Sequence, residues 1–294
     1  MGGYDRVTGT GALVIGDIMF DIIATPEPFR ELADDEIDYT DAVVEFRSGG
    51  TGTLLARSAL EFEFAPVGLL CSSGAEVDWR EEMLIGDLER KGIVPLLNRA
   101  SAGGVGTTVI GYFGTRRRMM FGAPGANVSP LDGRVVEKAV DFLSHSRVLI
   151  VSGYMLFRPT TFQGVVRIMQ AASDRGVLVA LDLLPHGIHK TFPLKKMSEA
   201  MRLVDVLAGS WTTLTALNNV KVASSEEYNF SSLAGLLDEF KAVLAHVPGY
   251  RSEFRSVGGF DFEVNWPASS EEKLRGHTDR VLVQSLSEYL RSIG

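Results

Sequence analysis

Residues 147–152 read Arg-Val-Leu-Ile-Val-Ser, residues 177–181 read Val-Leu-Val-Ala-Leu, and the segment 161–175 between them has helical spacing. Continuous apolar runs of this length are typical of strands that are covered on both faces. Gly176 stands directly before the second run, where it can end the helix in a left-handed conformation. A strand, a helix and a second strand in this order predict a β-α-β unit with parallel strands.

The same alternation extends to both sides of this unit. We expect further strands at residues 12–15, 65–71 and 204–208, and further helices at residues 54–62, 79–91 and 277–291. Apolar residues from Leu233 to Val247 fall three or four positions apart, which predicts one more helix that Pro248 and Gly249 end. The sequence therefore predicts an α/β fold, a doubly wound and mainly parallel sheet that is flanked by helices.

Two stretches break this alternation. Residues 40–47 and 104–121 have the two-residue period of strands, and Gly114-Thr115 marks a hairpin turn in the second stretch. We expect a small antiparallel sheet that covers a ligand cleft as a lid. The predicted organisation is a single α/β domain over residues 1–294, with lid strands inserted at about 37–48 and 104–122.

Composition excludes several classes of protein. The chain has 294 residues, of which 45% are hydrophobic and 22% charged, and a net charge of -8, so nucleic acid is not an expected partner. The single Cys71 cannot form an internal disulfide. The first apolar run contains Asp17 and Asp21, so we expect no signal peptide, no membrane span and a cytoplasmic location.

Several catalytic motifs are absent from the sequence. It contains no G-x-x-x-x-G-K-[ST] loop, no G-x-G-x-x-G after the first strand, no H-E-x-x-H and no G-x-S-x-G. The five histidines are too scattered to predict a metal site.

Two short segments near the N-terminus could bind a ligand. The first strand ends in Gly16-Asp17-Ile18-Met19-Phe20-Asp21, and ligands of open parallel sheets collect at the carboxyl ends of strands, where carboxylates can hold the hydroxyls of a polyol. Gly49-Gly50 precedes a predicted helix and would let backbone amides approach a ligand. Taken alone, Gly49-Gly50 fits a tight strand-to-helix turn as well as a ligand site. Residues 16–21 taken alone favour a solvated turn with a helix cap.

A third segment lies near the C-terminus. Gly276-His277-Thr278-Asp279 leads into the last predicted helix, whose N-terminus would present free N–H groups to an anion. Asp279 could take a proton from an attacking hydroxyl. The alternative for these four residues is a plain N-cap.

In order, these segments resemble the motifs of the ribokinase-like (PfkB-type) carbohydrate kinase family. The matching pieces are Gly16 to Asp21, Gly49-Gly50, residues 106–130, Asp182 with Pro185, and Gly276 to Asp279. The resemblance covers roughly residues 11–218.

The resemblance implies transfer of the γ-phosphoryl group of ATP, with Mg²⁺, to a hydroxyl of a sugar or nucleoside. It implies that Asp279 is the catalytic base. It implies an anion hole formed by the amides of Gly276, His277 and Thr278. It implies that the substrate is held by Asp17, Asp21, Gly49 and Gly50. The lid strands could also pair two chains into a homodimer.

The sequence also departs from the family pattern. Ser210 to Thr213 stand where the family has N-x-x-E, and His277 and Thr278 replace small residues of the anion hole. Leu54 replaces an asparagine that contacts the sugar in some members. These departures leave a second hypothesis open, a catalytically impaired sugar- or nucleoside-binding relative that acts as a sensor or partner subunit.

Overall fold

The structure is a computed structural model of the chain. It describes residues 9–26, 42–113, 117–183, 194–218, 228, 230–247, 251–265 and 277–293. The hairpin turn expected at Gly114-Thr115 and the predicted lid residues 37–41 lie outside this part of the chain.

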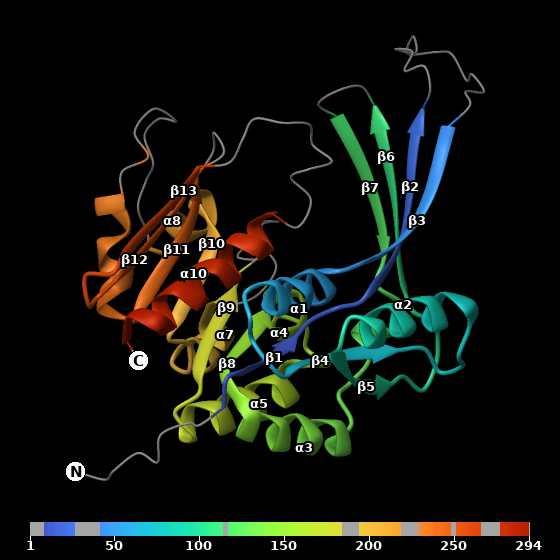
Figure 1. The fold of residues 1–294 in the computed structure, drawn as a ribbon, viewed down its shortest axis with the longest axis horizontal. Coiled ribbons are helices and arrows are strands. Elements are labelled where there is room, and N and C mark those ends of the chain that lie inside the picture. The colour runs from blue at the N-terminus through green and yellow to red at the C-terminus, as the bar shows by residue number, and fades with distance from the viewer. Residues whose placement is uncertain are drawn as a thin grey trace.

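A nine-stranded sheet forms the centre of the molecule (Figure 1). Its strands, in spatial order, are β13 (Asp261–Asn265), β12 (Arg251–Ser256), β11 (Ala242–Val247), β10 (Val206–Ser210), β9 (Leu178–Asp182), β8 (Ser146–Ser152), β1 (Gly11–Ile15), β4 (Val67–Ser73) and β5 (Ile93–Arg99). All neighbours from β11 to β5 are parallel, and only the pairs β11–β12 and β12–β13 at one edge are antiparallel. The predicted mainly parallel sheet is therefore confirmed.

Helices cover both faces of this sheet. One face packs against α3 (Gly133–Phe142), α4 (Gly153–Leu156), α5 (Phe162–Asp174), α7 (Leu194–Met201), α8 (Trp211–Leu217) and the 3₁₀ helices η2 (Leu143–His145) and η3 (Phe230–Asp238). The other face packs against α1 (Thr51–Glu61), α2 (Trp79–Arg90) and α10 (His277–Ile293). Successive residues of one strand point to opposite faces, so both sides of each central strand must be apolar.

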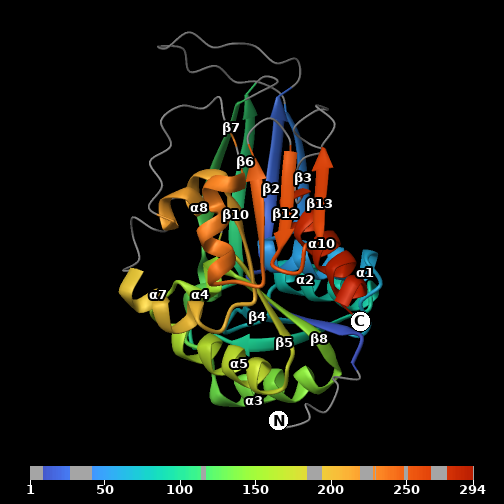
Figure 2. The same ribbon diagram turned by 90° about the vertical axis from the view of Figure 1, so that its left-hand side faces the viewer.

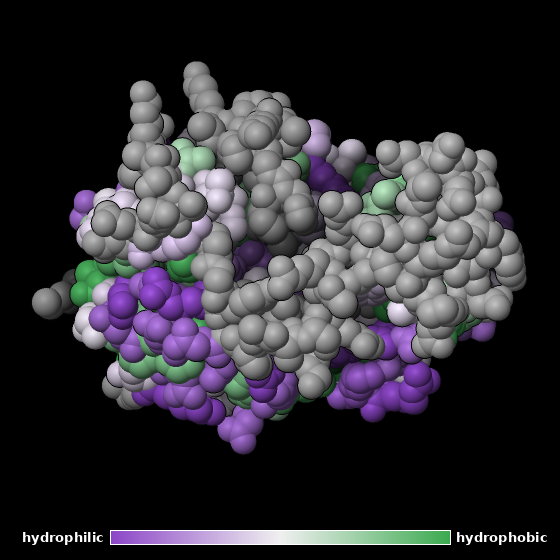
Figure 3. Space-filling view, turned by 90° about the horizontal axis from the view of Figure 1, so that it is seen from above, coloured by the Kyte–Doolittle hydropathy of each residue, from purple (hydrophilic) through white to green (hydrophobic). Residues whose placement is uncertain are grey.

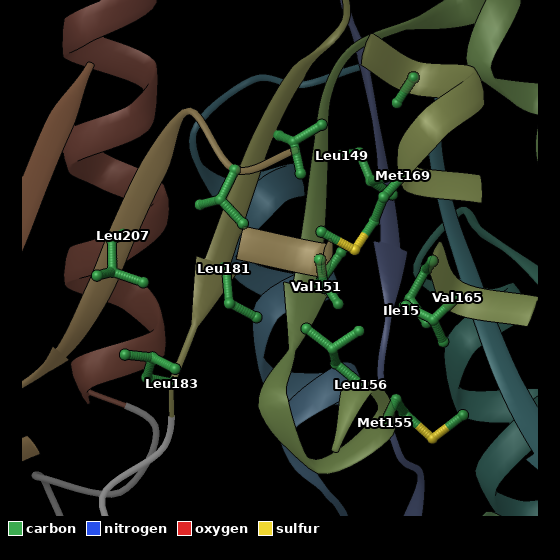
Figure 4. Packing of buried hydrophobic residues seen from close by; sticks show 14 of the residues in the cluster. Ile15, Leu149, Val151, Met155, Leu156, Val165, Met169, Leu181, Leu183 and Leu207 are labelled. Carbon is green, nitrogen blue, oxygen red and sulfur yellow. The ribbon is translucent and has the colours of Figure 1, made fainter. Parts of the chain in front are cut away.

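The first strand shows how this rule determines the core. Leu13 and Ile15 belong to one buried cluster, whereas Ala12 and Val14 belong to the other. Figure 4 shows Ile15, Val151 and Leu181, from three neighbouring strands, facing the side chains of α4 and α5. The apolar runs seen in the sequence are thus the parts of the chain that are buried on both sides.

The prediction of a helix between Leu233 and Val247 is wrong. This segment forms the short 3₁₀ helix η3 and then strand β11, which lies between β10 and β12. A short apolar run fits a buried helix and a buried strand equally well by spacing alone. The segment forms a strand because pairing with β10 and β12 satisfies the backbone N–H and C=O groups of β11 inside the sheet.

The lid is a separate four-stranded sheet that rises above the body of the molecule (Figures 1 and 2). It consists of β3 (Ala42–Gly49), β2 (Met19–Pro26), β6 (Gly106–Phe113) and β7 (Arg117–Ala123), in this order. The two outer pairs are antiparallel, and the central pair β2–β6 is parallel. The sequence did not predict β2, which begins two residues after Asp17 and continues the chain from the central sheet into the lid.

The lid carries most of the exposed apolar side chains among the described residues. They are Val43, Val44, Phe46, Val109, Met119, Met120 and Phe121. Seen from above, the described surface is mixed and largely hydrophilic (Figure 3). No helix among the described residues is both long and apolar enough to cross a membrane.

Candidate functional site

Asp17 lies in the turn between β1 and β2, just after the carboxyl end of β1. Its side chain is only 7% exposed, and its Oδ1 atom is buried without a hydrogen-bond partner among the described residues. Burial raises the pKa of Asp17, whereas nearby backbone amides, including those of Gly52 and Thr51, and the charge of Arg158 act in the opposite direction. Asp17 is therefore a buried acid that has one acceptor atom available.

The glycines around Asp17 allow α1 to approach the end of β1. A Cβ on Gly16 would lie 2.3 Å from the Cα of Gly52, and a Cβ on Gly50 would lie 2.5 Å from the carbonyl oxygen of Asp17. Gly50 also has a φ of 87°, a conformation that other residues rarely adopt. This contact places the N-terminus of α1 directly beside Asp17.

Asp21 and Gly49 lie together at the base of the lid. Asp21 on β2 is buried, and a Cβ on Gly49 would lie 1.8 Å from its Oδ2 atom. Gly49 is the last residue of β3, one position before Gly50. The Gly-Gly pair thus has two structural roles, because Gly49 makes space for a carboxylate and Gly50 makes space for the Asp17 backbone.

Asp279 comes from the other end of the chain and lies in the first turn of α10. It is 6% exposed, and its pKa is raised well above its usual range by burial, by Asp182 and by Asp17. The fold therefore brings three acids, Asp17, Asp182 and Asp279, close enough to interact electrostatically. Asp17 follows the end of β1, Asp182 ends β9, and Asp279 lies at the start of α10.

The three residues of the expected anion hole are only partly within the described chain. His277 and Thr278 form the start of α10, where His277 is partly buried and Thr278 is exposed. Burial, and then the charge of Arg280, lowers the pKa of His277. Gly276 lies outside the described residues, as does Pro185.

Two residues at this site were missed by the sequence analysis, Tyr154 and Arg158. Burial and the charges of Asp17, Asp182 and Asp279 raise the pKa of Tyr154 to about 12. Arg158 interacts electrostatically with Asp17 and with Tyr154. Neither residue belongs to a motif, and the only available signal was their position just after β8, at the carboxyl end of a predicted parallel strand.

Ser210 and Thr213, which the resemblance aligns with an N-x-x-E motif, lie at the start of α8. Ser210 is the N-cap of α8, its hydroxyl accepts a hydrogen bond from the amide of Thr213 at 3.2 Å, and the two hydroxyl groups lie 2.9 Å apart. These polar groups are therefore used to start a helix. Among the described residues, no three His, Cys, Asp or Glu side chains are grouped so that they could hold a metal ion.

Comparison with solved structures identifies the class of fold. The ribokinase of Arabidopsis thaliana, solved with ribose and ATP, matches with a TM-score of 0.69 and 16% identity over 97% of this chain and 87% of that chain. The ribokinase of Giardia lamblia matches with a TM-score of 0.69 and 14% identity over 89% and 77%. Phosphofructokinase-2 of Escherichia coli, solved with fructose-6-phosphate, matches with a TM-score of 0.69 and 12% identity over 95% and 88%.

A further match is a ribokinase II candidate from Escherichia coli in complex with ATP and Mg²⁺, with a TM-score of 0.72 and 16% identity over 97% and 87%. No family model matches the sequence. No curated protein matches it either. The chain has the ribokinase-like fold of sugar kinases, as the resemblance predicted, at a sequence identity that shows the fold alone.

Proposed function

We propose that the protein transfers the γ-phosphoryl group of ATP to a hydroxyl of a sugar or related small molecule. One observation carries this proposal: Asp279, in the first turn of α10, is buried beside Asp17 and Asp182 at the carboxyl ends of two strands. This is the edge of an open α/β sheet at which ligands bind. The ribokinase-like fold and the solved neighbours with bound sugar and ATP support the same function.

Asp279 is the proposed catalytic base. It accepts the proton of the substrate hydroxyl as the hydroxyl oxygen attacks the γ-phosphorus atom. A general base works best when its pKa lies near the working pH, so the raised pKa of Asp279 suits this role. The amides of Gly276, His277 and Thr278 are the proposed anion hole, because a helix N-terminus favours negative charge.

The substrate side of the site is proposed to be Asp17, Asp21, Gly49 and Gly50. Asp17 has the unpartnered Oδ1 acceptor that a sugar hydroxyl needs. Gly49 and Gly50 set the shape of the wall, since a larger residue at either position would collide with Asp21 or with the Asp17 backbone.

ATP and Mg²⁺ are the proposed donor and cofactor, and one neighbour was solved with both. Ser210 and Thr213 do not fit the role of the family's N-x-x-E motif, because their hydroxyl groups are used in the cap of α8. The proposed chemistry therefore assigns no step to a metal ion held by these residues.

A catalytically impaired relative that binds a sugar or nucleoside, as a sensor or partner subunit, is the alternative. The helix cap at Ser210 favours this alternative, because the phosphate side of the site then lacks the usual carboxylate.

A cytoplasmic location stays a prediction.

We also propose that the lid pairs two chains into a homodimer. Valine, methionine and phenylalanine side chains are exposed on β3, β6 and β7, and β3 and β7 are the edges of the lid sheet. Exposed apolar strands of this kind are typical of contact surfaces.

The decisive experiment compares the native chain with Asp279→Asn and with the exposed control Asp141→Asn. ATP turnover is measured with a panel of sugars and nucleosides, and sugar binding is measured by calorimetry. We expect Asp279→Asn to abolish turnover and keep sugar binding, with Asp141→Asn unchanged. Sugar binding without turnover by the native chain would favour the impaired relative, and full turnover by Asp279→Asn would exclude this residue as the base.

A further inference from the structure

Arg158 lies one residue after the C-cap of α4, at the same edge of the sheet as Asp17. Its Nη1 atom donates a hydrogen bond of 2.7 Å to the backbone carbonyl oxygen of Asn127. The side chain is partly buried. Arg158 is thus fixed at one end of its guanidinium, and its other N–H donors have no hydrogen-bond partner among the described residues.

Asn127 connects Arg158 to Asp17. It is fully buried in η1 (Gly125–Val128), and its Nδ2 atom donates a hydrogen bond of 2.9 Å to the carbonyl oxygen of Ile18. Ile18 is the residue directly after Asp17. A chain of two hydrogen bonds therefore sets the position of the guanidinium relative to the Asp17 turn.

Two buried acceptor atoms on this chain have no hydrogen-bond partner among the described residues. They are Oδ1 of Asp17 and Oδ1 of Asn127. A buried polar atom without a partner is costly, so such atoms in a folded protein call for a ligand or another explanation. The guanidinium of Arg158 does not satisfy them.

Arg158 and Asp17 are close without forming a direct ion pair. Each side chain affects the pKa of the other. No direct ion pair joins them among the described residues. A hydroxyl group is the simplest partner for both, since it can accept a hydrogen bond from the guanidinium and donate one to the carboxylate.

We propose that Arg158 is a specificity residue that, with Asp17, binds one hydroxyl of a neutral polyol substrate. This hydroxyl accepts a hydrogen bond from the Arg158 guanidinium and donates one to Oδ1 of Asp17. This inference adds a substrate class, neutral polyols, to the proposed function. It rests on the proposed function only in that sugars are chosen as the ligands.

The charges around Arg158 favour a neutral ligand over a phosphorylated one. The described charged groups that act on Tyr154 at this site are the single cation Arg158 and the acids Asp17, Asp182 and Asp279. A phosphate group bound to Arg158 would therefore face an excess of negative charge. A hydroxyl carries no such penalty.

The test measures ligand binding by calorimetry in the absence of ATP, so that it does not depend on catalysis. The probes are D-ribose, D-fructose, the monodeoxy analogues of each, and fructose-6-phosphate. The variants are Arg158→Met, Arg158→Lys and the exposed control Arg134→Met. Circular dichroism and thermal unfolding verify that each variant is folded, and Arg158→Lys, which keeps the charge, serves if Arg158→Met does not fold.

We expect the native chain to bind a neutral sugar, and Arg158→Met to weaken this binding about 10- to 100-fold, as is typical for a lost hydrogen bond to a charged group. Arg158→Lys should weaken it less, and Arg134→Met should not change it. One monodeoxy analogue should bind equally weakly to the native chain and to Arg158→Met, because it lacks the hydroxyl that Arg158 binds.

Three results would overturn the inference. The first is that the native chain binds fructose-6-phosphate more tightly than every neutral sugar. The second is that the native chain and Arg158→Met bind sugar with equal affinity, and the third is that no sugar in the panel binds. Absence of ATP turnover with intact, Arg158-dependent sugar binding would overturn only the proposed kinase activity.

Discussion

The carboxylate of Asp21 packs directly against the backbone of Gly49, so that a Cβ on Gly49 would lie 1.8 Å from Oδ2 of Asp21. This contact joins β2 to β3 at the point where the lid leaves the central sheet. The position of the lid above the site therefore depends on a residue without a side chain.

Gly49→Ala should displace Asp21 and destabilise the protein by about 1–3 kcal/mol, the usual cost of overpacking. Sugar affinity should fall as well, because β2 continues directly from the Asp17 turn. Urea unfolding and calorimetry measure the two effects. Gly133→Ala is the matched control, since a Cβ there would meet no atom within 4 Å. Equal stability of the two variants would contradict this role of Gly49.

Asp279→Asn should stabilise the protein at neutral pH. Burial and the neighbouring acids raise the pKa of Asp279 in the folded state well above the ordinary value of an aspartate, so folding opposes its ionisation. Each unit of difference in pKa corresponds to about 1.4 kcal/mol. The stability of the native chain should fall as the pH rises from about 4 through the folded-state pKa. The Asn variant, which cannot ionise there, should show a flatter profile.

Thermal unfolding between pH 4 and pH 8 measures this difference. We expect the variant to have a higher Tm than the native chain at pH 7 and a smaller advantage at pH 4. A lower Tm for Asp279→Asn at pH 7 would mean that a partner stabilises the ionised form.

Ser210→Ala should reduce stability by about 1 kcal/mol without changing ATP affinity. Ser210 caps α8 through the amide of Thr213, and loss of an N-cap has this typical cost. Thr212→Ala is the control, because Thr212 is exposed in the same turn. Weaker ATP binding with unchanged stability would instead make Ser210 part of the nucleotide site.

Phe121→Lys should convert a homodimer into a monomer. Phe121 is 62% exposed on β7, an edge strand of the lid, and a charge there would oppose burial between two chains. Light scattering after size exclusion gives the mass. Val257→Lys, which is equally exposed but lies outside the lid, should leave the mass unchanged. A native chain that is monomeric at micromolar concentration would refute pairing through the lid.

The sequence predicted five strands of the central sheet, β1, β4, β8, β9 and β10, because burial on both faces leaves a local signal. Residues 148–151 and 177–181 are continuously apolar. Strands β8 and β9 match the predicted strands at 147–152 and 177–181 within one residue at each end. Five strands were not predicted: β2, β5, β11, β12 and β13. Two of them show opposite reasons for the failure. β11 follows a stripe that fits a helix as well as a strand, and β2 contains Asp21, whose polar side chain looked like part of a turn.

The sequence by itself determined the layered α/β architecture, the position of Asp17 at the end of the first strand and the helix that begins near Asp279, because apolar spacing and helix starts are local properties. Only the tertiary structure decided that these two acids, from opposite ends of the chain, interact with each other and with Asp182. It also decided that Tyr154 and Arg158 lie beside them. The physical reason is that the parallel order of β9, β8 and β1 brings the carboxyl ends of distant strands to one edge, and that order depends on strand pairing, which no single segment of the sequence specifies.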